Sequence, residues 1–171
     1  MRRTRRACRT FVRSLQLPPV AGIRDLVPEL ERRTGRSLQL QPAEIGLSAP
    51  CGMWIATRAT DYVFYDPQTS RAHQDHIIAH EFGHMLKQHR GVPGYSANAE
   101  GLIQMMDPSV IELVLGRTDY DEIEEQEAEL VGSYLQQHIH ASRIRVKAQP
   151  GDLTADRVAK TFLRQGDRRD I

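Results

Sequence analysis

The stretch DHIIAHEFGHMLKQH, residues 75–89, places two histidines four positions apart, with a glutamate directly after the first. Residues four apart in a helix lie on one face, so His80 and His84 can each direct one imidazole nitrogen at a common metal ion. Glu81 lies about 100° around the helix from His80, where it reaches a water on that metal more easily than the metal itself. The spacing is typical of a zinc-activated hydrolytic centre with Glu81 as general base.

The residues around this motif predict a long helix from about residue 72 to 88. They form an apolar arc on the side away from His80, made of Ile78, Phe82 and Met85. Gly83 costs about 1 kcal/mol relative to alanine inside a helix, so we expect another part of the chain to approach it closely. His73 and His76 lie on the same stripe as His80. Because a catalytic zinc keeps one position open for water, we expect these two histidines to flank the site or face solvent.

Two histidines are too few ligands for zinc, and the expected source of a third is DEIEEQEAELVGSYL, residues 121–135. This stretch predicts a second long helix from about residue 120 to 140, with Asp119 or Asp121 as its N-cap. Five glutamates compete for the role: Glu122, Glu124, Glu125, Glu127 and Glu129. Glu125 shares its side of the helix with Ala128 and Gly132, which would let another helix pack closely. Periodicity alone leaves Glu125 slightly ahead, with Glu129 and Glu127 as open alternatives.

Composition predicts one soluble domain over residues 1–171, with a basic helix in residues 1–20 and a polar tail with a short helix in 148–171. Hydrophobic residues make up 40% of the chain, charged residues 26%, and the net charge is +1, which argues against bulk nucleic-acid binding. Cys8 and Cys51 are far apart and form no CxxC pair, which favours a reducing cytoplasm. No apolar run is long enough to cross a membrane.

The N-terminus concentrates positive charge in six arginines: Arg2, Arg3, Arg5, Arg6, Arg9 and Arg13. These arginines could bind an acidic or nucleic-acid partner. The favoured interpretation is the solvated face of a first helix, because Ala7, Phe11 and Leu15 recur every four residues as an apolar stripe. Direct nucleic-acid binding and membrane insertion are therefore not expected.

Three short segments predict strands: SLQLQP at 37–42, GMWIAT at 52–57 and DYVFYD at 61–66. Together they indicate a small, mainly antiparallel three-stranded sheet, which with the helices makes the fold class α+β. Ile23, Leu26, Val27 and Leu30 repeat at helical spacing, and Gly35 is the expected end of this helix. Because proline is tolerated in a first turn, the helix is expected to begin close to Pro28. A further short helix is predicted at 108–116, between loops.

The motifs HEFGH and EQEAELVGSYL together resemble the ImmA/IrrE family of metallopeptidases, whose zinc helix reads HE-x-GH and whose later helix reads E-x-x-A-[NDE]-x-x-A. The resemblance implies that His80, His84 and Glu125 bind Zn2+ and that Glu81 is the general base. It also implies a zincin-like helical domain, with the small sheet packed over the HExxH helix and an edge strand that pairs with an extended peptide. GMWIAT is the candidate for that edge.

The implied function is that of a cytoplasmic zinc-dependent endopeptidase of the gluzincin kind, which cleaves a helix-turn-helix repressor or antitoxin and thereby regulates transcription. The chain departs from the family pattern at Gly132, where alanine is usual, and in residues 133–140, where SYLQQHIH replaces an LLMP-like ending. The alternative is a non-enzymatic regulatory protein that contains zinc and binds its partner without cleavage. Tyr95, His89 and Tyr120 are candidates for the donor that stabilises an oxyanion, although a structural role suits each of them as well.

Overall fold

The computed structural model of the chain describes residues 2–43, 52–57, 59–89 and 120–147. Its elements, in chain order, are α1 (Arg2–Ser14), the 3-10 helix η1 (Ile23–Leu26), α2 (Val27–Thr34), β1 (Ser37–Pro42), β2 (Gly52–Ala56), β3 (Thr60–Tyr65), α3 (Arg71–Lys87) and α5 (Glu122–Lys147). The short helix predicted at 108–116, the helix predicted in the C-terminal tail, Tyr95 and Cys51 lie outside the described residues.

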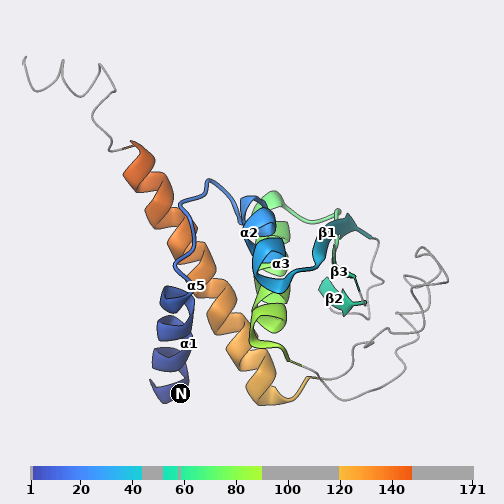
Figure 1. The fold of residues 1–171 in the computed structure, drawn as a ribbon, viewed down its shortest axis with the longest axis horizontal. Coiled ribbons are helices and arrows are strands. Elements are labelled where there is room, and N and C mark those ends of the chain that lie inside the picture. The colour runs from blue at the N-terminus through green and yellow to red at the C-terminus, as the bar shows by residue number, and fades with distance from the viewer. Residues whose placement is uncertain (1, 44–51, 58, 90–119, 148–171) are drawn as a thin grey trace, which may run out of the picture.

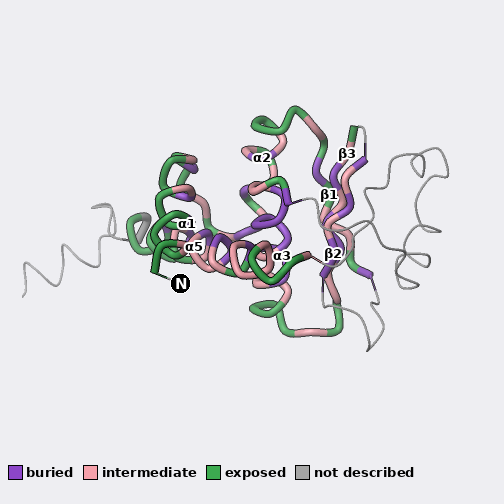
Figure 2. Tube along the Cα trace, turned by 90° about the horizontal axis from the view of Figure 1, so that it is seen from below, coloured by how far each residue is buried: buried purple, intermediate pink, exposed green. Residues whose placement is uncertain are grey.

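Helix α3 lies at the centre of the arrangement (Figure 1), with α5 on one side of it and the sheet on the other. Helix α1 packs against the far side of α5. The main core joins these layers: Ile78 and Phe82 of α3 are buried together with Val131 and Leu135 of α5. In Figure 2 the buried residues are concentrated on α3 and on the parts of α5 and the strands that face it. The apolar arc predicted for α3 is therefore confirmed.

The sheet has three strands in the order β1-β3-β2. Strand β3 runs antiparallel to β2 but parallel to β1, so the prediction of a mainly antiparallel sheet is wrong and the sheet is mixed. Strand β3 returns from β2 and lies between its two predecessors, where it buries Val63 on one face and Phe64 on the other. Strand β2 is at an edge of the three described strands, as expected.

Helix α2 begins and ends where the sequence indicates. Pro28 occupies the first turn, where its missing N–H costs no hydrogen bond. Gly35 ends the helix with a φ of 69°, a left-handed conformation that glycine adopts without steric cost. The backbone N–H of Gly35 donates to the carbonyl oxygen of Glu31 over 2.8 Å. This compact turn leads directly into β1.

The apolar stripe of α1 is offset from the predicted one. Cys8 and Val12 are buried against α5, Phe11 and Leu15 are half-buried, and Ala7 is exposed. The contact surface is therefore centred one residue later than the Ala7 spacing indicates. All six arginines of the helix are exposed, as expected of a solvated face. No helix among the described residues is both long and apolar enough to cross a membrane.

Candidate metal centre

Helix α3 runs from Arg71 to Lys87, close to the predicted bounds, and carries the HEFGH motif in its second half. Ser70 caps its start, where the hydroxyl oxygen accepts a hydrogen bond from the backbone N–H of His73 over 3.3 Å. Helix α5 begins after Asp121, whose carboxylate accepts from the backbone N–H groups of Ile123 and Glu124, each over 2.8 Å. These hydrogen bonds make Asp121 the cap, and Asp119, the other predicted cap, lies outside the described residues.

The crossing of α3 and α5 depends on small residues. A Cβ placed on Gly83 would lie 2.6 Å from the carbonyl oxygen of Ala128 and 2.9 Å from its Cα. A Cβ on Gly132 would lie 3.0 Å from the carbonyl oxygen of Ala79. The two backbones therefore approach each other at two positions, one on either side of the crossing. This explains the glycine inside α3 and holds the first turns of α5 beside the motif.

The crossing brings together one donor atom from each of His80, His84 and Glu125. The Nε2 atoms of His80 and His84 are 3.0 Å apart. The carboxylate of Glu125 places Oε2 3.4 Å from Nε2 of His80 and Oε1 3.8 Å from Nε2 of His84. All three donors lie within 4.8 Å of one another, and the group could hold a metal ion. These are the three residues that the sequence and the family resemblance indicate.

The donor set fits a tetrahedral metal ion. Ligands held about 2.0–2.1 Å from a tetrahedral zinc are separated from one another by about 3.3–3.4 Å. The two nitrogens are 3.0 Å apart and Oε2 of Glu125 is 3.4 Å from Nε2 of His80, both close to that value, whereas His84 is nearer to the other oxygen, Oε1, at 3.8 Å. Two imidazoles and one carboxylate also leave a fourth position for water or substrate, as catalytic sites require.

The site has a closed side and an open side. The side chain of His84 is 1% exposed, that of His80 23%, and that of Glu125 43%. Burial lowers the pKa of His80, and this outweighs the charges of Glu125 and Glu129, which raise it. The neutral imidazole, which is the form that binds a metal ion, is therefore favoured.

The two other glutamates considered as ligands contact the histidines elsewhere. Glu129 places a carboxylate oxygen 3.6 Å from Nδ1 of His80, the ring nitrogen opposite the donor atom. Glu127 reaches no donor of the group, and its carboxylate lies 3.4 Å from Nε2 of His89 and 2.8 Å from Nζ of Lys87. Burial raises the pKa of Glu127, but the hydrogen bonds from Lys87 and His89 outweigh it and hold this pKa below its usual value. Glu125 is thus the glutamate that the structure brings to both Nε2 atoms.

Glu81 is buried, with 6% of its surface exposed, against the edge strand β2. A Cβ on Gly52 would lie 2.9 Å from Oε1 of Glu81 and 2.4 Å from Cγ2 of Ile77. A side chain at this point of β2 would force Ile77 and Glu81 to shift. Gly52 therefore gives the Glu81 carboxylate its space between helix and sheet, a requirement that the sequence analysis did not identify.

Several aromatic rings surround His84. The ring of Tyr120 stacks on that of His84, with centroids 3.7 Å apart and an interplanar angle of 21°. His89 is buried, and its Nδ1 lies 3.1 Å from Nδ1 of His84. The two described candidates for an oxyanion donor thus pack against a ligand histidine. His73 is exposed and His76 contacts Glu129, so these two histidines flank the three-donor group as expected.

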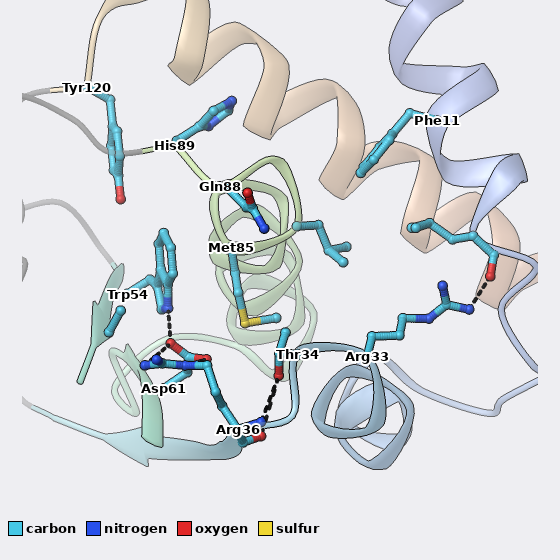
Figure 3. Close-up of a pocket in the computed structure, with 13 residues that line it drawn as sticks. Phe11, Arg33, Thr34, Arg36, Trp54, Asp61, Met85, Gln88, His89 and Tyr120 are labelled. Carbon is cyan, nitrogen blue, oxygen red and sulfur yellow. Dashed lines mark hydrogen bonds and ion pairs between the residues drawn. The ribbon is translucent and has the colours of Figure 1, made fainter. Parts of the chain in front are cut away.

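A cavity of about 680 Å³ lies beside the end of α3 (Figure 3). Tyr120 and His89 line one end of it, Trp54 and Asp61 line the sheet side, and Phe11 of α1 closes the opposite side. The indole N–H of Trp54 donates to Asp61 over 3.1 Å, and Arg36 pairs with the same carboxylate over 2.9 Å. The cavity therefore adjoins the closed side of the metal group, behind His84.

No protein-family model, curated protein or solved structure matches this chain. The resemblance to the ImmA/IrrE family accordingly depends on the two motifs, HEFGH and EQEAELVG, and on the order of elements. The functional argument depends on the arrangement of side chains described above.

Proposed function

We propose that the chain is a zinc-dependent endopeptidase with a zincin-like arrangement of helices and sheet. The observation that carries the proposal is the triangle of donors formed by Nε2 of His80, Nε2 of His84 and the carboxylate of Glu125. Glu81 directly follows the first ligand on the same helix. Two imidazoles, one carboxylate and an adjacent glutamate are the set of groups that zinc-assisted amide hydrolysis uses.

Each residue has a defined role in this proposal. His80, His84 and Glu125 would hold Zn2+, and a bound zinc would supply a water with a pKa lowered to about 7 and polarise the scissile carbonyl. Glu81 accepts the proton of the attacking water and later donates it to the leaving amine. The buried position of Glu81 against Gly52 keeps its carboxylate in one place. Strand β2, at an edge of the three described strands, is the proposed partner for an extended peptide next to that carboxylate.

The proposed substrate is a helix-turn-helix repressor or antitoxin in the cytoplasm, whose cleavage releases transcription. The support for this partner is the resemblance of the two motifs to the ImmA/IrrE family. The donor triangle supports the chemistry and is indifferent to the choice of protein substrate. Substrate and chemistry therefore need separate tests.

The test of the chemistry compares three variants after loading with Zn2+. Glu81→Gln should retain the metal and slow peptide cleavage about 10²–10⁴-fold, the range that a general base contributes. His80→Ala should lose both metal and cleavage. Glu122→Gln is the matched control, because Glu122 is exposed in the same acidic helix and lies outside the donor group. Metal content and new peptide termini from a random peptide library, read by mass spectrometry, decide the outcome.

The test of the substrate asks whether a neighbouring gene encodes a small helix-turn-helix protein, and mixes that protein with the zinc-loaded chain. The zinc-loaded chain should cut it at one or a few sites, and Glu81→Gln should bind it without cutting. Cleavage by Glu81→Gln at the unaltered rate would contradict the role of Glu81. Binding without cleavage by the unaltered chain, with zinc in place, would replace the endopeptidase with the non-enzymatic regulator.

A further inference from the structure

A buried group that the proposed chemistry does not use lies behind the ligand His84. It consists of His89, Glu127 and Lys87, and together with His84 it is called the relay below. His89 directly follows the C-terminal turn of α3, and Glu127 comes from the facing side of α5. Burial distinguishes this group from an ordinary surface ion pair, because the side chains of His84 and His89 are 1% and 6% exposed.

The turn that ends α3 places His89 in the relay. Gln88 adopts a left-handed conformation, with a φ of 55° and a ψ of 39°, at a position where glycine is usual. The backbone N–H of His89 then donates to the carbonyl oxygen of His84 over 3.0 Å, which is the six-to-one hydrogen bond of a Schellman motif. The reversal of the chain brings the ring of His89 against the ring of the ligand five residues earlier.

With a metal ion on Nε2 of His84, the contacts of the relay fit one arrangement of protons. Nε2 of His84 faces Nε2 of His80 and the Glu125 carboxylate, so a metal bound there would leave the proton of His84 on Nδ1. That Nδ1–H would donate to Nδ1 of His89, 3.1 Å away. The proton of His89 would then be on Nε2, which would donate to the Glu127 carboxylate over 3.4 Å.

Lys87 completes the relay on its outer side. Its Nζ lies 2.8 Å from Oε2 of Glu127, and both side chains are 22% exposed. The ammonium group holds the carboxylate in the ionised form that accepts from His89. The contacts thus run without a break from the ligand His84 through His89 and Glu127 to Lys87 at the surface.

We propose that His89 is a positioning residue for the metal ligand His84, which it holds in the tautomer and orientation that bind zinc. The inference rests on the metal site of the proposed function. Groups that accept a hydrogen bond from the second nitrogen of a ligand histidine are usually a carboxylate, a backbone carbonyl or water. Here a second imidazole supplies the acceptor and passes the hydrogen bond to a carboxylate on the facing helix.

The test measures zinc affinity by competition with a chelator, together with the thermal unfolding of the metal-free chain. His89→Leu keeps an apolar side chain of comparable size but removes the acceptor, and should weaken zinc binding by about 10–100-fold. His89→Asn places an amide oxygen near the position of Nδ1 and should restore most of the affinity. Gln88→Gly keeps the turn with the residue that suits it best and should bind zinc as the unaltered chain does.

Glu127→Gln is a second variant that leaves His89 in place. It should weaken zinc binding less than His89→Leu, because the amide oxygen still accepts from Nε2 of His89 but carries no charge. Nitrogen chemical shifts of the imidazoles give a readout independent of affinity. In the zinc-loaded chain they should show a proton on Nδ1 of His84 and on Nε2 of His89.

Unaltered affinity in His89→Leu, with unaltered folding, would overturn the inference. Equal weakening in His89→Leu and His89→Asn would also overturn it, since that result means that the ring fills space and its acceptor is unimportant. The proposed function fails separately: if the unaltered chain binds no zinc, the metal site is wrong. If the unaltered chain binds zinc and all His89 variants bind equally well, only the role of His89 is wrong.

Discussion

The two histidines of the metal group differ in what lies behind them. His84 is buried, and its second nitrogen lies 3.1 Å from His89. His89 in turn contacts Glu127, which pairs with Lys87. His80 is partly exposed and its second nitrogen lies 3.6 Å from Glu129, a side chain that is 51% exposed and is shared with His76. One half of the site is fixed by buried contacts, and the other half is open to solvent.

The difference follows from where each histidine lies on α3. His84 is one turn from the end of the helix, where the chain reverses over it and α5 covers it. His80 lies earlier in the helix, on the side from which the Glu125 carboxylate approaches. A site that must both hold a metal and admit a peptide needs one rigid half and one accessible half. The same asymmetry orders the expected effects of mutation.

Removal of a ligand should have the largest effect. His84→Ala and His80→Ala should each weaken zinc binding by more than about 100-fold. This loss exceeds the one expected when a residue that only contacts a ligand is replaced. His84→Ala should also destabilise the metal-free chain, because it empties a buried position and leaves His89 without its partner. His80→Ala should leave that stability almost unchanged. Zinc titration and thermal unfolding separate the two effects, and equal losses of stability would contradict the asymmetry.

Gly83→Ala should have the next largest effect on zinc binding. Because it displaces α5 from α3, it should disturb the surroundings of His80 and of His84 alike. The added Cβ would lie 2.6 Å from a backbone oxygen of Ala128, and such overpacking costs about 1–3 kcal/mol. This cost opposes the gain of up to about 1 kcal/mol from helix propensity. The free energy of unfolding and the zinc affinity should both fall.

Gly22→Ala is the control for that substitution. Gly22 has an extended φ of −150°, and a Cβ there would meet only the Asp25 carboxylate, at 3.6 Å. The free energy of unfolding of the Gly22→Ala variant should equal that of the unaltered chain or exceed it slightly. A loss in Gly22→Ala as large as that in Gly83→Ala would mean that the helix crossing is not the cause.

Glu129→Gln should have the smallest effect on zinc binding. Glu129 is half exposed and its contact with His80 is long, and exposed ionic contacts contribute about 0–1 kcal/mol. The fall in zinc affinity should therefore be smaller than that in His89→Leu, measured by the same competition. A larger fall in Glu129→Gln would reverse the roles of the two halves.

The local features of this molecule could be read from its sequence. His80 and His84 lie on one helix as predicted, another part of the chain approaches Gly83 closely, and Gly35 ends a helix. The pairing of β1 with β3 could not be predicted, because strand order depends on which non-consecutive strands meet in space. Ile123 shows the same limit, because it is apolar and yet 67% exposed near the start of α5.

The choice among the glutamates also needed the structure. Periodicity places Glu125, Glu127 and Glu129 within one and a half turns, and each of them contacts a different atom of the histidines around it. The roles depend on the crossing of α3 and α5, which no helical period specifies. The relay was missed because its signal is a histidine five residues after the second ligand, a spacing that does not share a helix face. Only the turn at Gln88 makes that spacing meaningful.

The central claim is that His80, His84 and Glu125 bind one zinc ion. The most direct measurement is an anomalous difference map, recorded at the zinc absorption edge from crystals of the chain loaded with ZnCl2. The account predicts a single strong peak about 2.0–2.2 Å from Nε2 of both histidines and from a carboxylate oxygen of Glu125. A peak coordinated by Glu127 or Glu129 instead of Glu125, or no peak between α3 and α5, would contradict it.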